Sequence, residues 1–312
     1  MWRGRGMPRP YVRDSAMDGA DTGSRTVEEV KDRILAHERC GVMVIGGSDT
    51  GKTTLIEQLA DLLAASSAVA IVDADMGQSH IGPPTTIAWG LVKEQFPGWD
   101  NVDAADYYFV GATSPYKHVL PTVVGAKLIC DAARSAAPYM IVDTTGLITG
   151  SVGCALKWGK IDAVQPDMVL AVQKAYELES ILIPYAHMSA PLIVRIESPD
   201  VVVSKSVDQR TAYRERMFAR YFAGSSVIEL SAEKVSIRCT ETASRPRQPH
   251  LLNRLVSLRN QVNMDIALGI VVEEDARGNS FLVRTPLKTV QNVSTIVMGD
   301  LCISPDGKQL EA

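Results

Sequence analysis

The segment Gly46-Gly-Ser-Asp-Thr-Gly51-Lys52-Thr53 decides the fold, because it matches the phosphate-binding pattern G-x-x-x-x-G-K-[ST] at every fixed position. It follows a short apolar run and opens a helical stretch, which is the context the pattern requires. Glycine permits close approach, so backbone N–H groups at a helix start can point at phosphates. The residues expected to bind nucleotide are Gly46, Gly47, Ser48, Asp49, Thr50, Gly51, Lys52, Thr53 and Thr54.

Two of these side chains have expected chemical roles. The ammonium group of Lys52 should reach the β- and γ-phosphate oxygens, and the hydroxyl of Thr53 should coordinate Mg²⁺. The cofactors expected on this ground are a nucleoside triphosphate, ATP or GTP, and Mg²⁺.

Short apolar runs alternate with helical stretches over most of the chain, which predicts an α/β fold with a doubly wound, mainly parallel sheet. The expected strands are Val42–Ile45, Ala68–Val72, Tyr107–Val110, Tyr139–Val142, Met168–Val172, Leu192–Ile196 and Val227–Leu230. The expected helices are Thr53–Ala65, Tyr116–Ala136, Val152–Val164, Ala175–Ala186 and Asp208–Phe222.

The composition changes twice along the chain. Residues 1–24 are rich in Gly, Arg, Asp and Ser and are expected to be a disordered lead-in. The P-loop domain is expected over 25–233, with a helical lid near 205–223. After about residue 234, short β-prone pieces separated by turn signals predict a small, mostly β C-terminal domain over 234–312.

Bulk composition excludes several classes of protein. Of 312 residues, 46% are hydrophobic and 22% charged, and no apolar run is long enough to span a bilayer. The net charge of −4 argues against binding of long nucleic acids through bulk charge. The five cysteines are scattered without C-x-x-C spacing, so we expect free thiols in a reducing cytoplasm, with neither zinc nor disulfides.

Acidic residues follow the second apolar run, in Asp73-Ala-Asp75-Met-Gly77-Gln78. Two carboxylates two residues apart can project from one side at the carboxyl edge of a strand, where open α/β sheets bind ligands. We expect Asp73 and Asp75 to hold Mg²⁺, partly through water, and one of them to accept a proton from an attacking hydroxyl. The alternative is that one carboxylate simply caps the next turn.

A second acidic strand end reads Asp143-Thr144-Thr145-Gly146, which is similar to the D-x-x-G segment of GTPases. No N-K-x-D-like segment for guanine recognition follows a later strand, and this weakens a GTPase interpretation. A further candidate is the expected helix with Arg210 and Arg214, whose i, i+4 spacing puts both guanidinium groups on one face. Such a pair could close over a transferring phosphoryl group, or it could be a solvated basic face.

In this order, the motifs of the chain resemble those of the polynucleotide 5′-hydroxyl kinases, the RNA kinases related to mRNA cleavage-factor and rRNA-processing kinases, in their short prokaryotic form. The resemblance covers about residues 40–230. The motifs that carry it are Gly46–Thr53, Asp73–Gln78, Pro83-Pro84-Thr85, Thr113-Ser114-Pro115, Thr144-Thr145-Gly146 and the Arg210/Arg214 helix.

The resemblance implies transfer of the γ-phosphate of a nucleoside triphosphate to the 5′-hydroxyl of RNA, and in some members of DNA. It implies catalytic roles for Lys52, for Asp75 as the group that activates the hydroxyl, and for Arg210 and Arg214 as lid arginines. The positions that it implies in contact with the substrate are Gln78, Thr85, Thr144 and Gly146.

The expected partner is therefore a single-stranded RNA 5′ end, with no membrane and no zinc, in the cytoplasm. Two other functions fit the same core: a nucleotide-switched GTPase-like binding or scaffold protein, and a P-loop kinase for a small molecule. Guanine-selective binding with slow hydrolysis would favour the first, and phosphorylation without any oligonucleotide would favour the second.

Overall fold

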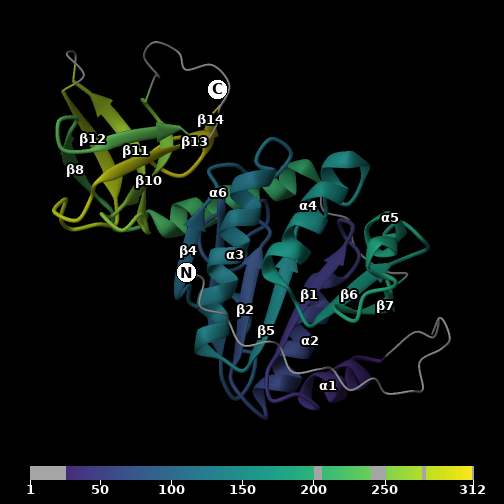
Figure 1. Ribbon diagram of the computed structural model, residues 1–312. Coiled ribbons are helices and arrows are strands. Elements are labelled where there is room, and N and C mark those ends of the chain that lie inside the picture. Colours follow the sequence, from purple (N-terminus) through teal and green to yellow (C-terminus); the bar gives the residue numbers. More distant parts are fainter. Residues whose placement is uncertain (1–25, 200–205, 240–250, 276–278, 311–312) are drawn as a thin grey trace, which may run out of the picture.

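The computed structural model describes residues 26–199, 206–239, 251–275 and 279–310. Two sheets make up the molecule, one mainly parallel and one mainly antiparallel, and they lie end to end (Figure 1). The expected lead-in, residues 1–24, lies outside the described residues, so its prediction stays untested. No helix of the described residues is long and apolar enough to cross a membrane.

The first sheet has the strand order β4-β3-β2-β5-β1-β6-β7. Five adjacent strands of this sheet, from β2 to β7, are parallel, as the uninterrupted apolar runs predicted. The strands are β1 (Cys40–Gly46), β2 (Val69–Ala74), β3 (Thr86–Val92), β4 (Asp106–Phe109), β5 (Tyr139–Thr144), β6 (Met168–Gln173) and β7 (Leu192–Glu197).

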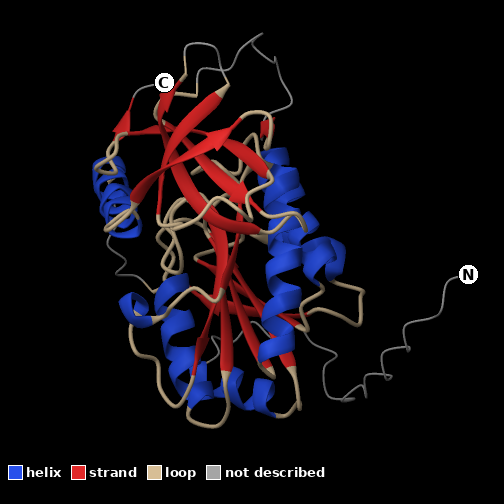
Figure 2. Ribbon diagram, turned by 90° about the vertical axis from the view of Figure 1, so that its left-hand side faces the viewer, coloured by secondary structure: helices blue, strands red, loops and turns tan. Residues whose placement is uncertain are grey.

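Helices cover both faces of this sheet, because alternate residues of its strands point to opposite sides. In β1, Val42 and Val44 pack in the cluster beneath α1 and α2, whereas Met43 and Ile45 pack beneath α3, α4 and α5. Figure 2 shows the helices on either side of the sheet. The helices are α1 (Val27–Leu35), α2 (Lys52–Ala64), α3 (Val119–Ala136), α4 (Gly150–Val164) and α5 (Glu179–Leu182), with 3₁₀ turns at Trp99–Asn101 and Ile183–Tyr185.

Two predictions about this half need correction. The strand at Tyr107–Val110 is present as β4, but the chain reaches it through β3, which pairs antiparallel with β2 and which the sequence analysis missed. The long helix expected over Ala175–Ala186 is only the four-residue α5 followed by a 3₁₀ turn. Pro184 lies at the start of that turn, and its missing N–H prevents an α-helix from continuing through it.

A second, mostly antiparallel sheet follows α6 (Val207–Tyr221), and it begins at Ser226 instead of near residue 234, where the β-rich part was predicted to start. Its strand order is β14-β13-β10-β11-β12-β8, with β9 beside β13. The strands are β8 (Ser226–Ser231), β9 (Ser236–Cys239), β10 (Arg254–Arg259), β11 (Asp265–Glu274), β12 (Ser280–Thr285), β13 (Thr295–Ile303) and β14 (Gln309–Leu310).

The strand expected at Val227–Leu230 was wrongly assigned to the parallel sheet. It is β8, which pairs antiparallel with β12 at the edge of the second sheet. The cause is the preceding helix: at about 1.5 Å per residue, α6 carries the chain roughly 22 Å away from the parallel sheet before β8 begins.

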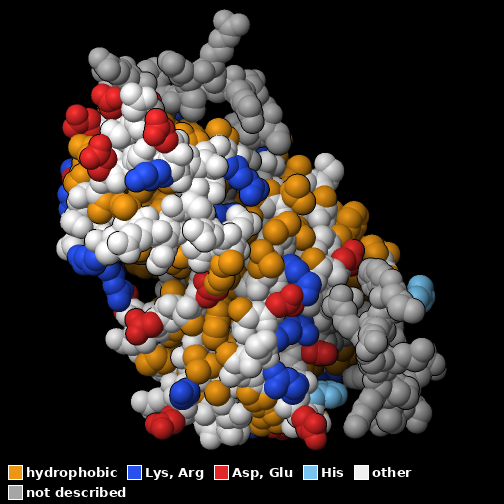
Figure 3. Space-filling model, turned by 60° about the vertical axis from the view of Figure 1, so that its left-hand side comes forward, with side chains coloured by type: hydrophobic (Ala, Val, Ile, Leu, Met, Phe, Trp, Pro, Cys, Tyr) orange, Lys and Arg blue, Asp and Glu red, His pale blue; other side chains and the backbone are white. Residues whose placement is uncertain are grey.

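The outer face of α3 is apolar. Leu120, Val124 and Leu128 recur at every fourth position and are 74%, 39% and 54% exposed. Figure 3 shows hydrophobic side chains in a band down the lower part of the face drawn there. Because Leu120, Val124 and Leu128 are exposed, they add little to the core of the sheet.

A buried ion pair joins the two halves. Arg259 Nε donates to Asp265 Oδ1 over 2.7 Å, and each side chain is 2% exposed. The other oxygen of Asp265 accepts the backbone N–H of Phe109 in β4 over 2.9 Å. The carboxylate thus ties the second sheet to the edge strand of the first.

We expect Asp265→Ala to lower the free energy of unfolding by about 3–5 kcal/mol, because it leaves the Arg259 guanidinium buried without its counter-ion. Chemical denaturation followed by circular dichroism would measure the loss. Asp131→Ala is the matched control, since it breaks the exposed Lys127–Asp131 pair, which should be worth about 0.2–1 kcal/mol. Equal losses in the two variants would contradict the account.

Candidate active site

The ends of three neighbouring strands form the site. In the sheet, β5 lies between β1 and β2, so the loops that leave these strands are adjacent at their carboxyl edge. The phosphate-binding segment follows β1, Asp75 follows β2, and Asp143 is the last residue but one of β5. The strand register puts Asp73 directly opposite Asp143. Residues far apart in the sequence therefore meet in one place.

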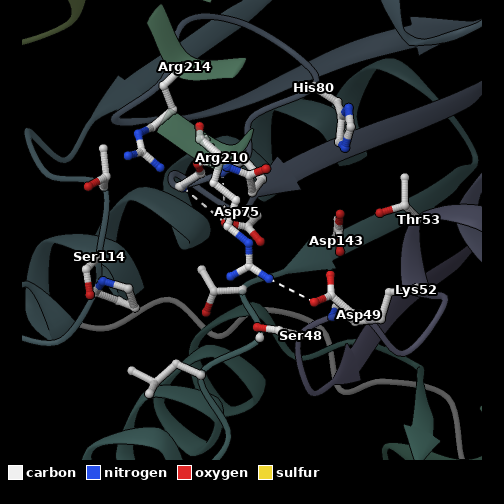
Figure 4. Close-up of a pocket in the computed structure, with 17 residues that line it drawn as sticks. Ser48, Asp49, Lys52, Thr53, Asp75, His80, Ser114, Asp143, Arg210 and Arg214 are labelled. Atoms are coloured by element: carbon white, nitrogen blue, oxygen red, sulfur yellow. Dashed lines mark hydrogen bonds and ion pairs between the residues drawn. The ribbon is translucent and has the colours of Figure 1, made fainter. Parts of the chain in front are cut away.

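A cavity of about 280 Å³ opens at this edge. Phosphate-loop residues, acidic groups and two arginines share its wall (Figure 4). The residues that line it are Ser48, Asp49, Lys52, Thr53, Asp75, Gly77, Gln78, His80, Thr113, Ser114, Pro115, Asp143, Thr145, Gly146, Leu147, Arg210 and Arg214.

The phosphate loop has the close packing that its glycines allow. A Cβ on Gly46 would lie 2.6 Å from the carbonyl oxygen of Val172, and Gly51 has a φ of +88°, which favours glycine. Lys52 is 8% exposed, and its ammonium group donates to the carbonyl oxygen of Gly47 over 2.6 Å. Thr53 reaches the cavity, whereas Thr54, the last residue predicted to bind nucleotide, is exposed on α2 outside the cavity lining.

The two carboxylates of the acidic segment lie in different surroundings. Asp75 lines the cavity, and its Oδ1 accepts the backbone N–H groups of Gly77 and Gln78 over 3.1 and 3.3 Å. Asp73 is 1% exposed and does not line the cavity. Its oxygens accept the N–H groups of Asp75 and Ile81, both over 3.0 Å, so Asp73 shapes the loop instead of facing a ligand.

Burial and crowding raise the pKa values of two acids here. Burial and the carboxylate of Asp143 raise the pKa of Asp73 well above its usual range. Burial raises the pKa of Asp143 to about 6, with the nearby Lys52 opposing the rise and Asp75 adding to it. From its motif, Asp143 is predicted only as part of a GTPase-like segment. The motif does not reveal that Asp143 lies opposite Asp73, because strand pairing decides that position.

The loop after β5 packs directly on the phosphate loop. A Cβ on Gly146 would come 2.3 Å from Ser48 Oγ and 2.6 Å from the Ser48 backbone nitrogen, so only glycine fits there. Thr145 lines the cavity, but its neighbour Thr144, predicted to touch substrate, is fully buried and donates from Oγ1 to the carbonyl oxygen of Val44 over 2.8 Å.

The other predicted substrate contacts also separate into two groups. Gln78 lines the cavity, and its Nε2 donates to the carbonyl oxygen of Gly77 over 2.7 Å and to that of Arg210 over 3.5 Å. Thr85 is fully buried away from the cavity, and its carbonyl oxygen accepts the N–H groups of Val110 and Gly111. Thr85 therefore supports the strand ends beneath the site.

Both arginines predicted for the lid reach the cavity from α6. Arg210 Nη2 lies 2.9 Å from Asp49 Oδ2, so the guanidinium group spans the cavity to the phosphate loop (Figure 4). Arg214 donates to Gln309 Oε1 in β14 from Nε and Nη2, over 3.3 and 3.0 Å. The second sheet thus fixes one arginine and the phosphate loop the other.

The donor set suits a triphosphate and a hard divalent cation. Lys52, the loop amides and two arginines supply positive charge and N–H donors, while Thr53, Asp75 and Asp143 supply oxygen ligands. Within the described ranges, no cluster of three or more His, Cys, Asp or Glu side chains could hold a metal by itself. Mg²⁺ in such sites keeps phosphate and water ligands beside one or two carboxylates.

Comparison with known proteins places the chain in a family. The family model described as mRNA cleavage and polyadenylation factor CLP1 P-loop matches residues 46–224. The polyribonucleotide 5′-hydroxyl-kinase of Pyrococcus furiosus is 29% identical over 330 residues, covering 89% of this chain and 92% of that one. That of Methanocaldococcus jannaschii is 37% identical over 201 residues, which cover 64% of this chain and 55% of that one.

Solved structures agree on the fold. Clp1p, in its wild-type complex with Pcf11p, superimposes with a TM-score of 0.70 at 13% sequence identity, covering 88% of this chain and 78% of that one. At that identity the likeness shows the fold alone.

We expect Gly146→Ala to raise the Kd for a fluorescent ATP analogue by about tenfold, because the new methyl group must displace the phosphate loop at Ser48, an overpacking strain of roughly 1–3 kcal/mol. Gly150→Asn is the control in the same loop, since a Cβ there meets nothing within 4 Å and asparagine tolerates the φ of +68°. Unchanged binding in Gly146→Ala would contradict the packing argument.

Proposed function

The chain belongs to the mRNA cleavage and polyadenylation factor CLP1 P-loop family, and on that premise we propose that it is a polynucleotide 5′-hydroxyl kinase. It transfers the γ-phosphate of ATP or GTP to the 5′-hydroxyl of a single-stranded RNA end. The observation that carries the proposal is that Asp75, the phosphate loop, Arg210 and Arg214 all line one cavity. A nucleotide switch does not need a carboxylate placed beside the phosphate loop to receive an acceptor hydroxyl.

The nucleotide would bind with its phosphates on the loop Gly46–Thr53. Backbone N–H groups and Lys52 hold the β- and γ-phosphates there, while the helix start of α2 adds its positive end. On binding, the ammonium group of Lys52 must leave the carbonyl oxygen of Gly47 and donate to a phosphate oxygen instead. The new hydrogen bond is the stronger one, because its acceptor is charged.

Mg²⁺ would be held by Thr53 together with Asp75 and Asp143, partly through water. Asp143 replaces Asp73 in this role, because Asp73 spends both oxygens on backbone N–H groups. Burial raises the pKa of Asp143 and the carboxylate of Asp75 adds to the rise, so a cation bound between the two acids would favour their charged forms. When bound, the ion neutralises charge that develops on the phosphate oxygens.

Asp75 is the proposed base for the acceptor hydroxyl. Two backbone N–H groups hold its Oδ1, which leaves the carboxylate oriented at the cavity and largely unable to turn. An unmodified 5′-hydroxyl is a weak nucleophile at neutral pH, so a positioned carboxylate that orients it and takes its proton speeds the attack. Arg210 and Arg214 stabilise the charge on the transferring group from the opposite side.

The direct test is transfer of labelled γ-phosphate from ATP, and separately from GTP, to a short RNA with a 5′-hydroxyl. We expect label on the RNA end, and we expect Lys52→Ala to abolish it, because the phosphates lose their ammonium contact. If the protein binds nucleotide and leaves the RNA unlabelled, the kinase proposal is wrong and a switch or scaffold becomes the better account. Label on a small molecule alone would point to a metabolite kinase.

Asp75→Asn should lower turnover by about 10²–10⁴-fold, the usual contribution of a general base, while nucleotide affinity stays near that of the wild type. Turnover comes from initial rates at saturating ATP and RNA, and affinity from a fluorescent nucleotide titration. Asp131→Asn, on the exposed face of α3, is the matched control and should retain full turnover. Full turnover in Asp75→Asn would show that Asp75 is not the base.

A further inference from the structure

Two lysines of α4, Lys157 and Lys160, are fully buried beneath the cavity. They are one helical turn apart, at i and i+3, so their side chains leave the helix on one face. A buried ammonium group is costly unless hydrogen bonds and opposite charges compensate it. Neither lysine lines the cavity, and the proposed mechanism gives neither of them a role.

Lys157 holds the loop that follows β5. Its ammonium group donates to Thr144 Oγ1 over 2.8 Å and to the carbonyl oxygen of Thr145. Thr145, Gly146 and Leu147 then continue along the cavity wall. The lysine therefore holds the start of this loop from outside the cavity.

Lys160 holds the segment that follows β2. Its ammonium group donates to the carbonyl oxygen of Ala74 over 3.1 Å, and the next residue along the chain is Asp75. Ala74 lies opposite Thr144 in the parallel pairing of β2 with β5. The two lysines thus bind the ends of β2 and β5, and the segments that follow these strands form two walls of the cavity.

Charges of both signs surround the two lysines, because Lys160 and Lys52 repel the ammonium group of Lys157 while nearby acids attract it. Asp75 and Asp143 both act on the two lysines, and the acids in turn crowd one another. Burial lowers the pKa of Lys160 to about 8 and that of Lys157 well below its usual range. Two methionines would fill the same space at less cost in desolvation, so the lysines supply something that packing alone does not.

We infer that Lys157 and Lys160 are positioning residues for phosphoryl transfer: Lys160 sets where Asp75 stands, and Lys157 sets the Thr145–Leu147 wall against which the acceptor end lies. The inference rests on the proposed kinase function. Displacing a reacting group by about 1 Å can cost on the order of 10²-fold in rate, so contacts behind the cavity affect turnover without touching substrate.

The test compares Lys157→Met and Lys160→Met in steady-state assays with ATP and a 5′-hydroxyl RNA. Lys160→Met should lower kcat by about 10–100-fold with both KM values near those of the wild type, because Asp75 is displaced. Lys157→Met should raise KM for the RNA by about tenfold, because the Thr145–Leu147 wall moves. KM for ATP should rise by less, since the wall meets the phosphate loop only where Gly146 packs on Ser48. Lys127→Met, which changes an exposed lysine of α3, is the control and should match the wild type.

A merely structural role predicts a different pattern: a lower melting temperature, with kcat and both KM values changing together. That pattern, or wild-type kinetics in both variants, would overturn the inference. If neither the wild type nor the variants label RNA, it is the kinase proposal that fails. The separate changes in kcat and in KM for the RNA therefore distinguish a positioning role from loss of the fold and from loss of the kinase activity.

Thr144→Val keeps the inference testable if Lys157→Met does not fold. It removes the hydroxyl that Lys157 binds and changes little volume. It should raise KM for the RNA in the same direction, and an unchanged KM for the RNA in this variant would contradict the inference. If Lys157→Met does fold, a double-mutant cycle adds a second check, because the two changes together should cost no more than Lys157→Met alone. Additive effects would mean that the hydroxyl and the ammonium group act separately, which contradicts the inference.

Discussion

The structure depends on how charge is balanced where β1, β5 and β2 end side by side. Asp73 and Asp143 lie opposite one another in the sheet, with Asp75 on the next loop. Three carboxylates this close would repel one another and lose their protons reluctantly. Lys52 from the phosphate loop, the two buried lysines of α4 and the backbone N–H groups on Asp73 and Asp75 offset that repulsion. A site balanced in this way is prepared for a divalent cation and a polyphosphate.

The remainder of the chain holds this balance in place and completes the cavity. The second sheet is fastened to β4 by the buried Arg259–Asp265 pair, and α6 runs between the two sheets, with Phe218 and Phe222 packed among residues of both. This packing brings the two arginines over the phosphate loop. The C-terminal strand β14 takes part too, because Gln309 accepts both hydrogen bonds from Arg214. The small domain therefore contributes to the geometry of the site.

The sequence predicted those features that depend on local pattern. The phosphate loop, the parallel strands and the helix with Arg210 and Arg214 all have short signals with a direct physical meaning. It failed where tertiary pairing decides: β8 carries an apolar pattern like the other strands, yet only the length of α6 determines which sheet it joins. Thr85 and Thr144 match the family's motifs, but their burial follows from packing that spacing does not encode. No motif marks Lys157 and Lys160, which become informative only because α4 turns them into the interior.

The decisive experiment is a crystal structure of the protein with a non-hydrolysable ATP analogue, Mg²⁺ and a short 5′-hydroxyl RNA. We expect the 5′-oxygen within about 2.6–3.2 Å of a carboxylate oxygen of Asp75, in line with the γ-phosphate. We also expect Lys52 to contact the phosphates and Arg210 to be released from Asp49. A 5′ end bound outside this cavity, or a nucleotide with its γ-phosphate turned away from Asp75, would contradict the proposed mechanism.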